Sequence, residues 1–492
     1  MTFDIATLAH NAIEQLSFHP GEPLMFNSGL FWVLMILFLP VYGMLRSRRW
    51  QMMLWVVAFS LFFAYKSSGW AVVMLVCTSV IDWWLALRIA STESTKHKKL
   101  WLWLSIVCSA GVLIFFKYSN FVIWNVNALV NSNFQPLDLV LPIGLSFYTF
   151  RTISYVVDVY KGKIAPTTNY LEYLFFLSFF PCLVAGPIVR AVDFLPQLKE
   201  LKPATRTMIY GGLWLFLLGV LKKAVVADYL SQYNDIVFGT PDGYTGVELL
   251  MAILGYTMQI YCDFSGYSDM AIGLGAVMGF DLGINFNFPY RSLSVTEFWR
   301  RWHISLSLWL RDYIYIGMGG NRKGKFRQYV NLMVTMLVGG LWHGAAWKFV
   351  LWGAGHGGAL CIHKAFMPWL KRLPKSRIID FMSWLLTMVV VASLWVFFRA
   401  DDAATACSML AGTVTRMDVA YFPVFFQVRY VWCLMMAIVI ALHYVPQTVY
   451  DGLRQWFVES FWIFKLLIFV AVVQLVLEFA AADVQPFLYA QF

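Results

Sequence analysis

The sequence predicts an all-α membrane protein that crosses the bilayer many times. Of its 492 residues, 60% are hydrophobic and only 13% are charged. Apolar stretches of about 17–25 residues recur along the chain, and each could cross a hydrocarbon core as a helix. They lack the two-residue alternation of barrel strands, so the spans are helical. We expect about 10–12 transmembrane helices, plus re-entrant or interfacial helices where Pro and Gly break the runs, as at residues 141–144 and 185–187.

The first 24 residues are predicted to differ from the rest. No basic residue precedes the first apolar run, which argues against a signal peptide. Apolar residues recur there at helical spacing, which predicts an amphipathic helix on the membrane surface. No linker interrupts residues 25–492, so we expect them to form a single integral-membrane domain.

Four clusters of Lys and Arg predict the topology. They lie at residues 46–49, 96–99, 321–327 and 371–377, and the positive-inside rule places them in the cytoplasm. The amino terminus should then be outside. These basic loops and their attraction to anionic lipid headgroups explain the net charge of +10, so the charge does not indicate a nucleic-acid partner. A hairpin of two spans between the last two clusters would carry His343 toward the outer end of its first arm.

Two histidines mark a candidate site within the membrane. His303 lies in Arg-Arg-Trp-His-Ile-Ser at 300–305, and His343 in Gly-Gly-Leu-Trp-His-Gly at 339–344. An imidazole at bilayer depth is costly unless it faces a cavity or a partner. The small residues beside His343 would let a substrate or a neighbouring backbone approach closely. We interpret His356 as structural, and the other histidines, near loops or helix ends, indicate nothing more specific. Seven cysteines without a CxxC pattern predict core residues rather than a metal site or disulfides.

The helix around His303 is expected to begin at a capping box formed by Ser294 and Glu297. At 100° per residue, one face of a continuous helix would carry four polar residues: Arg300, His303, Ser307 and Arg311. Alternatively, the arginines extend to the headgroups and His303 is a hydrogen-bonded core residue.

Two carboxylates, Asp263 and Asp269, lie upstream in an apolar stretch. Burial of an ionised carboxylate requires compensation, and we expect the charge to come from Arg300, Arg301 or Arg190. Helical spacing would also pair Gln259 with Asp263 and Ser265 with Asp269, unless Gly266 interrupts the helix. A purely architectural ion pair is the alternative role for each carboxylate.

Several motifs together resemble the membrane-bound O-acyltransferase family. They are residues 298–307 and 340–345 around the two histidines, with 141–150, 184–190, 263–269 and 396–400. The resemblance covers most of the chain from about residue 25. It is nearest to the bacterial branch that contains the alginate O-acetyltransferase membrane subunit and the teichoic-acid D-alanyl transferase.

The resemblance implies a ring of tilted helices around a tunnel, with His343 catalytic. We assign His343 as general base, because an imidazole with an ordinary pKa of about 6.5 can accept a proton near neutral pH. His303 would polarise the thioester carbonyl or orient the attack. Candidates for substrate or donor binding are Arg300, Trp302, Ser307, Trp342, Asp263, Asp269 and Arg190. We expect no bound cofactor or metal; acetyl-CoA, or the phosphopantetheine arm of an acyl carrier, would be the donor substrate.

The expected function is O-acetylation of an extracytoplasmic polysaccharide from the bacterial cytoplasmic (inner) membrane. The acetyl group would pass directly to the polymer or through an exported partner acetyltransferase. One alternative is D-alanyl transfer from a carrier protein to a cell-wall polymer. Another is a proton-coupled transporter that uses the histidines and carboxylates as a relay, although no paired discontinuous helices are evident.

Overall fold

A computed structural model describes residues 5–20 and 22–479, and within these ranges the regular structure is entirely helical. This confirms the predicted all-α class. The chain forms two compact units, Met1–Ala204 with Met278–Leu282, and Thr205–Val277 with Gly283–Phe492. That residues 25–492 act as one integral-membrane domain stays a prediction.

Five helical stretches among the described residues are long and apolar enough to cross a membrane: Arg49–Ser91, Thr95–Val130, Arg206–Gly239, Arg377–Arg399 and Trp462–Phe479. A sixth crossing arises if the bent pair Tyr421–Val428 and Tyr430–His443 is one span. Length and composition thus identify fewer spans than the predicted 10–12, and the full count stays a prediction.

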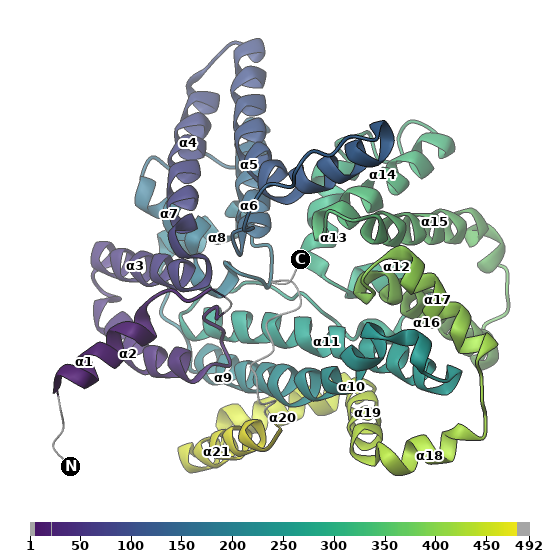
Figure 1. Cartoon of the computed structure of the whole chain (residues 1–492). Helices are drawn as coiled ribbons and strands as arrows, with labels where there is room; N and C mark the ends of the chain where they lie inside the picture. The colour runs from purple at the N-terminus through teal and green to yellow at the C-terminus, as the bar shows by residue number, and fades with distance from the viewer. Residues whose placement is uncertain (1–4, 21, 480–492) are drawn as a thin grey trace. The chain divides into compact units, whose positions relative to one another are not determined.

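The first unit consists of eight described α-helices (Figure 1). They are α1 (Ile5–Leu16), α2 (Gly29–Leu45), α3 (Arg49–Ser68), α4 (Val72–Ser91), α5 (Thr95–Val130), α6 (Leu145–Tyr160), α7 (Tyr170–Ser178) and α8 (Ala191–Glu200). Helix α1 lies where the amphipathic helix was predicted, and its place on a membrane surface stays a prediction. Helices α4 and α5 pack against each other, and buried Asp82 on α4 accepts hydrogen bonds of 2.6 Å from the hydroxyls of Ser105 and Ser109 on α5.

The second unit contains the remaining helices. They are α9 (Arg206–Val220), α10 (Asp228–Gly239), α11 (Gly246–Val277), α12 (Val295–Arg301), α13 (Ile304–Trp309), α14 (Lys325–His343), α15 (Trp347–Leu370), α16 (Arg377–Arg399), α17 (Ala403–Thr415), α18 (Tyr421–Val428), α19 (Tyr430–His443), α20 (Gln447–Glu459) and α21 (Trp462–Phe479). A π-helical segment, Leu221–Ala227, joins α9 to α10, and another, Leu310–Tyr315, follows α13.

Helices α9 and α11 run side by side in the second unit (Figure 1). A methyl group on Gly219 would lie 2.5 Å from the carbonyl oxygen of Gly266, and one on Gly212 would lie 2.6 Å from that of Gly273. Both contacts are closer than any real side chain permits, so glycine is what lets the two backbones meet. Helix α11 is continuous through Gly266, which therefore packs against α9 and does not interrupt the helix.

Helices α14 and α15 pack against each other where the hairpin was predicted, linked by residues 344–346, and their crossing of the membrane stays a prediction. Gly353 on α15 lies against α14, where a methyl group would be 2.6 Å from the carbonyl oxygen of Met336. His343 is the last residue of α14. With a rise of about 1.5 Å per residue, the helix places it about 27 Å from Lys325, at the opposite end from the basic residues 321–327. The sidedness of the two ends stays a prediction.

Candidate active site

The helix breaks at Trp302 and His303. Helix α12 ends at Arg301, Trp302 is extended, and His303 adopts a left-handed conformation with φ 41° and ψ 56° before α13 begins. The predicted continuous helix is therefore wrong, and with it the single face shared by Arg300, His303, Ser307 and Arg311.

Hydrogen bonds with residues 285–287 account for this break between α12 and α13. The backbone N–H of Asn287 donates to the carbonyl of Arg301 at 2.9 Å, and that of Ile304 donates to the carbonyl of Asn285 at 2.8 Å. A left-handed conformation at a residue other than glycine costs on the order of 1–3 kcal/mol and persists only where surrounding structure enforces it. The segment 285–287 supplies that constraint.

The start of α12 matches the prediction. The hydroxyl of Ser294 accepts the backbone N–H of Glu297 at 3.2 Å, and the Glu297 carboxylate accepts the N–H of Leu293 at 3.0 Å. The same carboxylate accepts a 2.9 Å hydrogen bond from Nε of Arg301. The capping box thus also holds Arg301 beside its own helix.

His303 is fully buried and is held by a side-chain amide. Its Nδ1 lies 3.1 Å from Oδ1 of Asn285, whose Nδ2 donates to the hydroxyl of Ser268 on α11 at 3.0 Å. The ring of Phe264, also on α11, meets the imidazole edge-on with centroids 4.6 Å apart. Helix α11 therefore fixes both the position and the orientation of His303.

The ring of Trp342 lies next to both predicted histidines. Its centroid is 6.1 Å from that of His303 and 5.0 Å from that of His343. His343, 4% exposed, also packs edge-on against Trp352 and Phe398, with centroids 5.0 and 5.1 Å away. The structure thus brings the two histidines into one aromatic cluster through a tryptophan that the sequence motif had placed beside His343.

Two further histidines are buried in the second unit. His356 accepts a hydrogen bond from the indole N–H of Trp299 at 3.3 Å, and its ring lies 4.8 Å from that of Trp352. His443 accepts the backbone N–H of Tyr290 through Nε2 at 3.2 Å. The sequence analysis treated His443 as uninformative, because a position near a helix end did not indicate that its side chain would be buried.

Trp302 and Ser307 lie close together in the same unit. Trp302 is 1% exposed and packs against Trp395 and Phe298, with centroids 4.8 and 5.6 Å away. The hydroxyl of Ser307 donates to the carbonyl of Trp302 at 3.3 Å. Their proposed contact with substrate stays a prediction.

The carboxylates of α11 pair with lysines. Nζ of Lys223 lies 2.6 Å from Asp263 and 2.7 Å from Asp228, and Nζ of Lys222 lies 2.6 Å from Asp269. A lysine thus lies beside Asp269 where an arginine was predicted, and Asp263 has a lysine partner that the sequence analysis did not predict. The signal was present, since two adjacent lysines interrupt the apolar run that ends at residue 227.

Two other residues of this region have partners that differ from the prediction. The side-chain oxygen of Gln259 accepts a hydrogen bond from Asn234 at 2.8 Å. Arg301 bonds to Glu297, as described above. Arg190 belongs to the first unit, where it directly precedes α8, and its role as a partner of a carboxylate stays a prediction.

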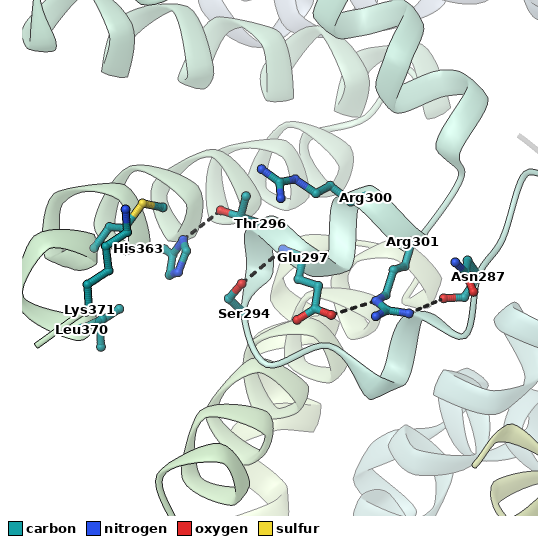
Figure 2. Close-up of a pocket in the computed structure, with 10 residues that line it drawn as sticks. Asn287, Ser294, Thr296, Glu297, Arg300, Arg301, His363, Leu370 and Lys371 are labelled. Atoms are coloured by element: carbon teal, nitrogen blue, oxygen red, sulfur yellow. Dashed lines mark hydrogen bonds and ion pairs between the residues drawn. The ribbon is translucent and has the colours of Figure 1, made fainter. Parts of the chain in front are cut away.

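A cavity of about 680 Å³ opens beside α12 (Figure 2). It is lined by Asn287, Ser294, Thr296, Glu297, Arg300, Arg301, His363, Met367, Leu370 and Lys371. Figure 2 shows Arg301 directed toward Glu297 and Asn287, whereas Arg300 leaves the helix in another direction. Nδ1 of His363 lies 2.8 Å from the hydroxyl of Thr296. Sequence reasoning identified Arg300 here but missed His363 and Lys371.

The lining of this cavity excludes both His303 and His343, so the tunnel implied by the resemblance stays a prediction. One segment nevertheless connects the two places. Asn287 lines the cavity, and Asn285, two residues earlier, holds His303. Within the described residues, no group of three or more His, Cys, Asp or Glu could hold a metal ion.

Residues 163–400 match the model of the MBOAT, or membrane-bound O-acyltransferase, family. The chain is 42% identical over 397 residues to a probable alginate O-acetylase of Pseudomonas aeruginosa, covering 78% of this chain and 74% of that protein. The protein belongs to the membrane-bound O-acyltransferase family. The matched region includes both histidines, the lysine–aspartate pairs and the whole cavity lining.

Other relatives of this O-acyltransferase carry different names. A peptidoglycan O-acetyltransferase of Helicobacter pylori is 37% identical over 428 residues, 80% of each chain. A teichoic acid D-alanyltransferase of Bacillus subtilis is 26% identical over 370 residues, 72% of this chain and 92% of that one. Membership of this family, together with the apolar helices, makes the protein a multi-pass membrane enzyme and argues against the transporter alternative.

Proposed function

We propose that this O-acyltransferase moves an acetyl group from acetyl-CoA to hydroxyl groups of an extracytoplasmic polysaccharide, working in the bacterial cytoplasmic membrane. The observation that carries the proposal is the placement of His303 and His343 in one buried aromatic cluster, in which both rings lie next to Trp342. The relatives named for O-acetylation are more similar to this chain than the one named for D-alanyl transfer, which favours an acetyl donor.

His343 acts as the general base in this proposal. As the hydroxyl oxygen attacks the thioester carbonyl, His343 accepts the hydroxyl proton. The new C–O bond forms, the C–S bond breaks, and the coenzyme A sulfur leaves with the proton returned by His343. The rings of Trp342, Trp352 and Phe398 around His343 keep bulk water away from the thioester.

The cavity beside α12 is the proposed site for the phosphates of the donor. Arg300, Arg301 and Lys371 bring three positive charges to its wall, against the single carboxylate of Glu297. Charge-assisted hydrogen bonds from such side chains are suited to phosphate oxygens. Lys371 begins a basic loop predicted to be cytoplasmic, which is the compartment that holds acetyl-CoA. The donor is a substrate, not a resident cofactor.

The acceptor is proposed to lie on the other side of the membrane. A polymer cannot enter a buried cluster whole, so either a single sugar hydroxyl reaches the site or an exported partner acetyltransferase takes the acetyl group first. His343 lies at the end of α14 opposite the basic residues 321–327, which suits transfer toward the outer face.

Donor choice is tested with the purified full-length protein in nanodiscs. We expect release of free coenzyme A from acetyl-CoA, accelerated by a co-encoded exported partner or by the acceptor polysaccharide. The matched comparison replaces acetyl-CoA with a D-alanylated carrier protein under the same conditions. Turnover of the carrier alone would overturn the acetyl assignment and favour D-alanyl transfer, while turnover of neither would contradict the proposed activity.

A further inference from the structure

Three hydrogen bonds converge on one oxygen atom next to His303. Oδ1 of Asn285 lies 3.2 Å from the backbone nitrogen of Ser305, 2.9 Å from the Ser305 hydroxyl and 3.1 Å from Nδ1 of His303. Asn285 lies between α11 and α12, is 1% exposed, and also receives the backbone N–H of Ile304 on its carbonyl. The side-chain oxygen and the backbone carbonyl of Asn285 therefore both bond to the turn that contains His303.

The orientation of the Asn285 amide is fixed by its neighbours. The backbone N–H of Ser305 can only donate, so the side-chain atom facing it must be the oxygen. The amide nitrogen then points to the hydroxyl of Ser268, which can accept. An amide oxygen only accepts hydrogen bonds, and so Nδ1 of His303 must carry the hydrogen.

We infer that Asn285 is a positioning residue that holds neutral His303 with its hydrogen on Nδ1 and a lone pair on Nε2. Which nitrogen of a neutral imidazole carries the proton is set by the bond that the other makes. Before the reaction, Nε2 of His303 accepts the hydrogen bond of the incoming hydroxyl and so orients its oxygen toward the thioester; during the attack this one hydrogen leaves Nε2 and passes as a proton to His343. A neutral His303 in this tautomer cannot donate through Nε2 to the thioester carbonyl, which decides between the two roles that the sequence left open.

His356 shows that the same unit sets the opposite tautomer elsewhere. Its Nδ1 faces the indole N–H of Trp299, which can only donate. Nδ1 of neutral His356 is therefore the unprotonated nitrogen, and Nε2 carries the hydrogen. Two buried histidines of one cluster thus differ in tautomer because one faces an amide oxygen and the other an indole N–H.

The tautomer can be measured without any substrate. The experiment is ¹⁵N NMR of the full-length protein in lipid, labelled at the histidine ring nitrogens, with the His303 signals assigned by their loss in His303→Gln. We expect a protonated Nδ1 and an unprotonated Nε2 for His303, and the reverse for His356. Protonation of His303 on Nε2 with a bare Nδ1 would overturn the inference.

Kinetics of Asn285 variants give the second readout. Asn285→Leu removes the acceptor and should lower kcat on the order of 100-fold, the low end of what a positioned acid or base contributes, with KM for acetyl-CoA unchanged. Asn285→Asp keeps an acceptor oxygen and should retain most of kcat. Ser268→Ala is the matched comparison, because it removes the partner of Nδ2 but leaves Oδ1 in place, and it should lower kcat clearly less than Asn285→Leu.

The inference about the hydroxyl rests on the proposed function, but the two can fail separately. If folded Asn285→Leu turns over acetyl-CoA at the normal rate, or if Asn285→Asp loses as much kcat as Asn285→Leu, the positioning role is wrong. If Asn285→Leu does not fold, the NMR result of the unmodified protein and the Asn285→Asp rate decide the question. If the unmodified protein does not use acetyl-CoA, the proposed function fails while the tautomer measurement still stands.

Discussion

The second unit buries polar side chains in two contrasting ways. In the histidine cluster, formed by His303, Trp342, His343, Trp352, His356 and Phe398, imidazoles lie among aromatic rings. In the lysine–aspartate cluster, formed by Lys222, Lys223, Asp228, Asp263 and Asp269, each charge lies against an opposite one. A charge held in a buried pair is costly to change, whereas an imidazole can accept and return a proton. The first arrangement suits chemistry and the second suits architecture.

The largest effect is expected from the removal of Lys223, which lies between two carboxylates of the lysine–aspartate cluster. Lys223→Met removes the cation that lies 2.6 Å from the carboxylate of Asp263 and 2.7 Å from that of Asp228, and we expect a loss of about 3–5 kcal/mol of stability. The measurement is thermal unfolding in detergent, followed by the amount of monodisperse protein, together with turnover per folded molecule. Normal stability with lost turnover would move Lys223 into the active site.

Lys222 provides the matched comparison for that experiment. Nζ of Lys222 lies 2.6 Å from one carboxylate, that of Asp269, whereas Nζ of Lys223 lies within 2.7 Å of two. Lys222→Met therefore removes the cation beside one carboxylate, and Lys223→Met removes the cation beside two. Lys222→Met should destabilise the protein clearly less than Lys223→Met; equal losses would show that the number of carboxylates beside the lysine does not govern this cluster.

Close packing of α9 on α11 gives the next largest expected effect. Gly219→Ala places a methyl group 2.5 Å from the Gly266 carbonyl oxygen, so the two helices must separate. Overpacking of this kind costs about 1–3 kcal/mol. The control is Gly239→Ala, because nothing lies within 4 Å of the carbon added there. The difference between the thermal unfolding of the two variants then measures the cost of overpacking α9 against α11. Indistinguishable melting curves would contradict the close approach.

Substitutions of the two arginines at the cavity should differ in effect: that of Arg301 should lower stability, and that of Arg300 should weaken donor binding. Arg301 bonds to Glu297 at 2.9 Å and to the carbonyl of Asn287 at 3.2 Å, so Arg301→Ala should lower stability by about 1–2 kcal/mol. Arg300 is exposed at the cavity, and Arg300→Ala should raise KM for acetyl-CoA several-fold with kcat and stability retained. A steady-state series on both variants checks this, and the reverse pattern would exchange their roles.

The sequence predicted what depends on local pattern. Hydropathy indicated membrane helices, the spacing of Ser294 and Glu297 indicated the start of α12, and the motifs indicated both histidines. The break at His303 was missed because it depends on hydrogen bonds with residues 285–287. These residues lie outside the segment whose periodicity predicted a continuous helix. The lysine partners of Asp263 and Asp269 were missed for a similar reason, since only the packing of α11 against the segment after α9 brings them together.

The most direct test of the account is the rate of acetyl-CoA turnover by His343→Ala in nanodiscs, beside the unmodified protein and a His97→Ala control. His97 is an exposed residue near the start of α5 in the first unit, so its removal should leave turnover unchanged. We predict that His343→Ala folds and inserts normally but loses turnover by about 10²–10⁴-fold, the contribution of a positioned base. Normal turnover by folded His343→Ala would contradict the assignment of His343 as the general base and with it the chemical role of the histidine cluster.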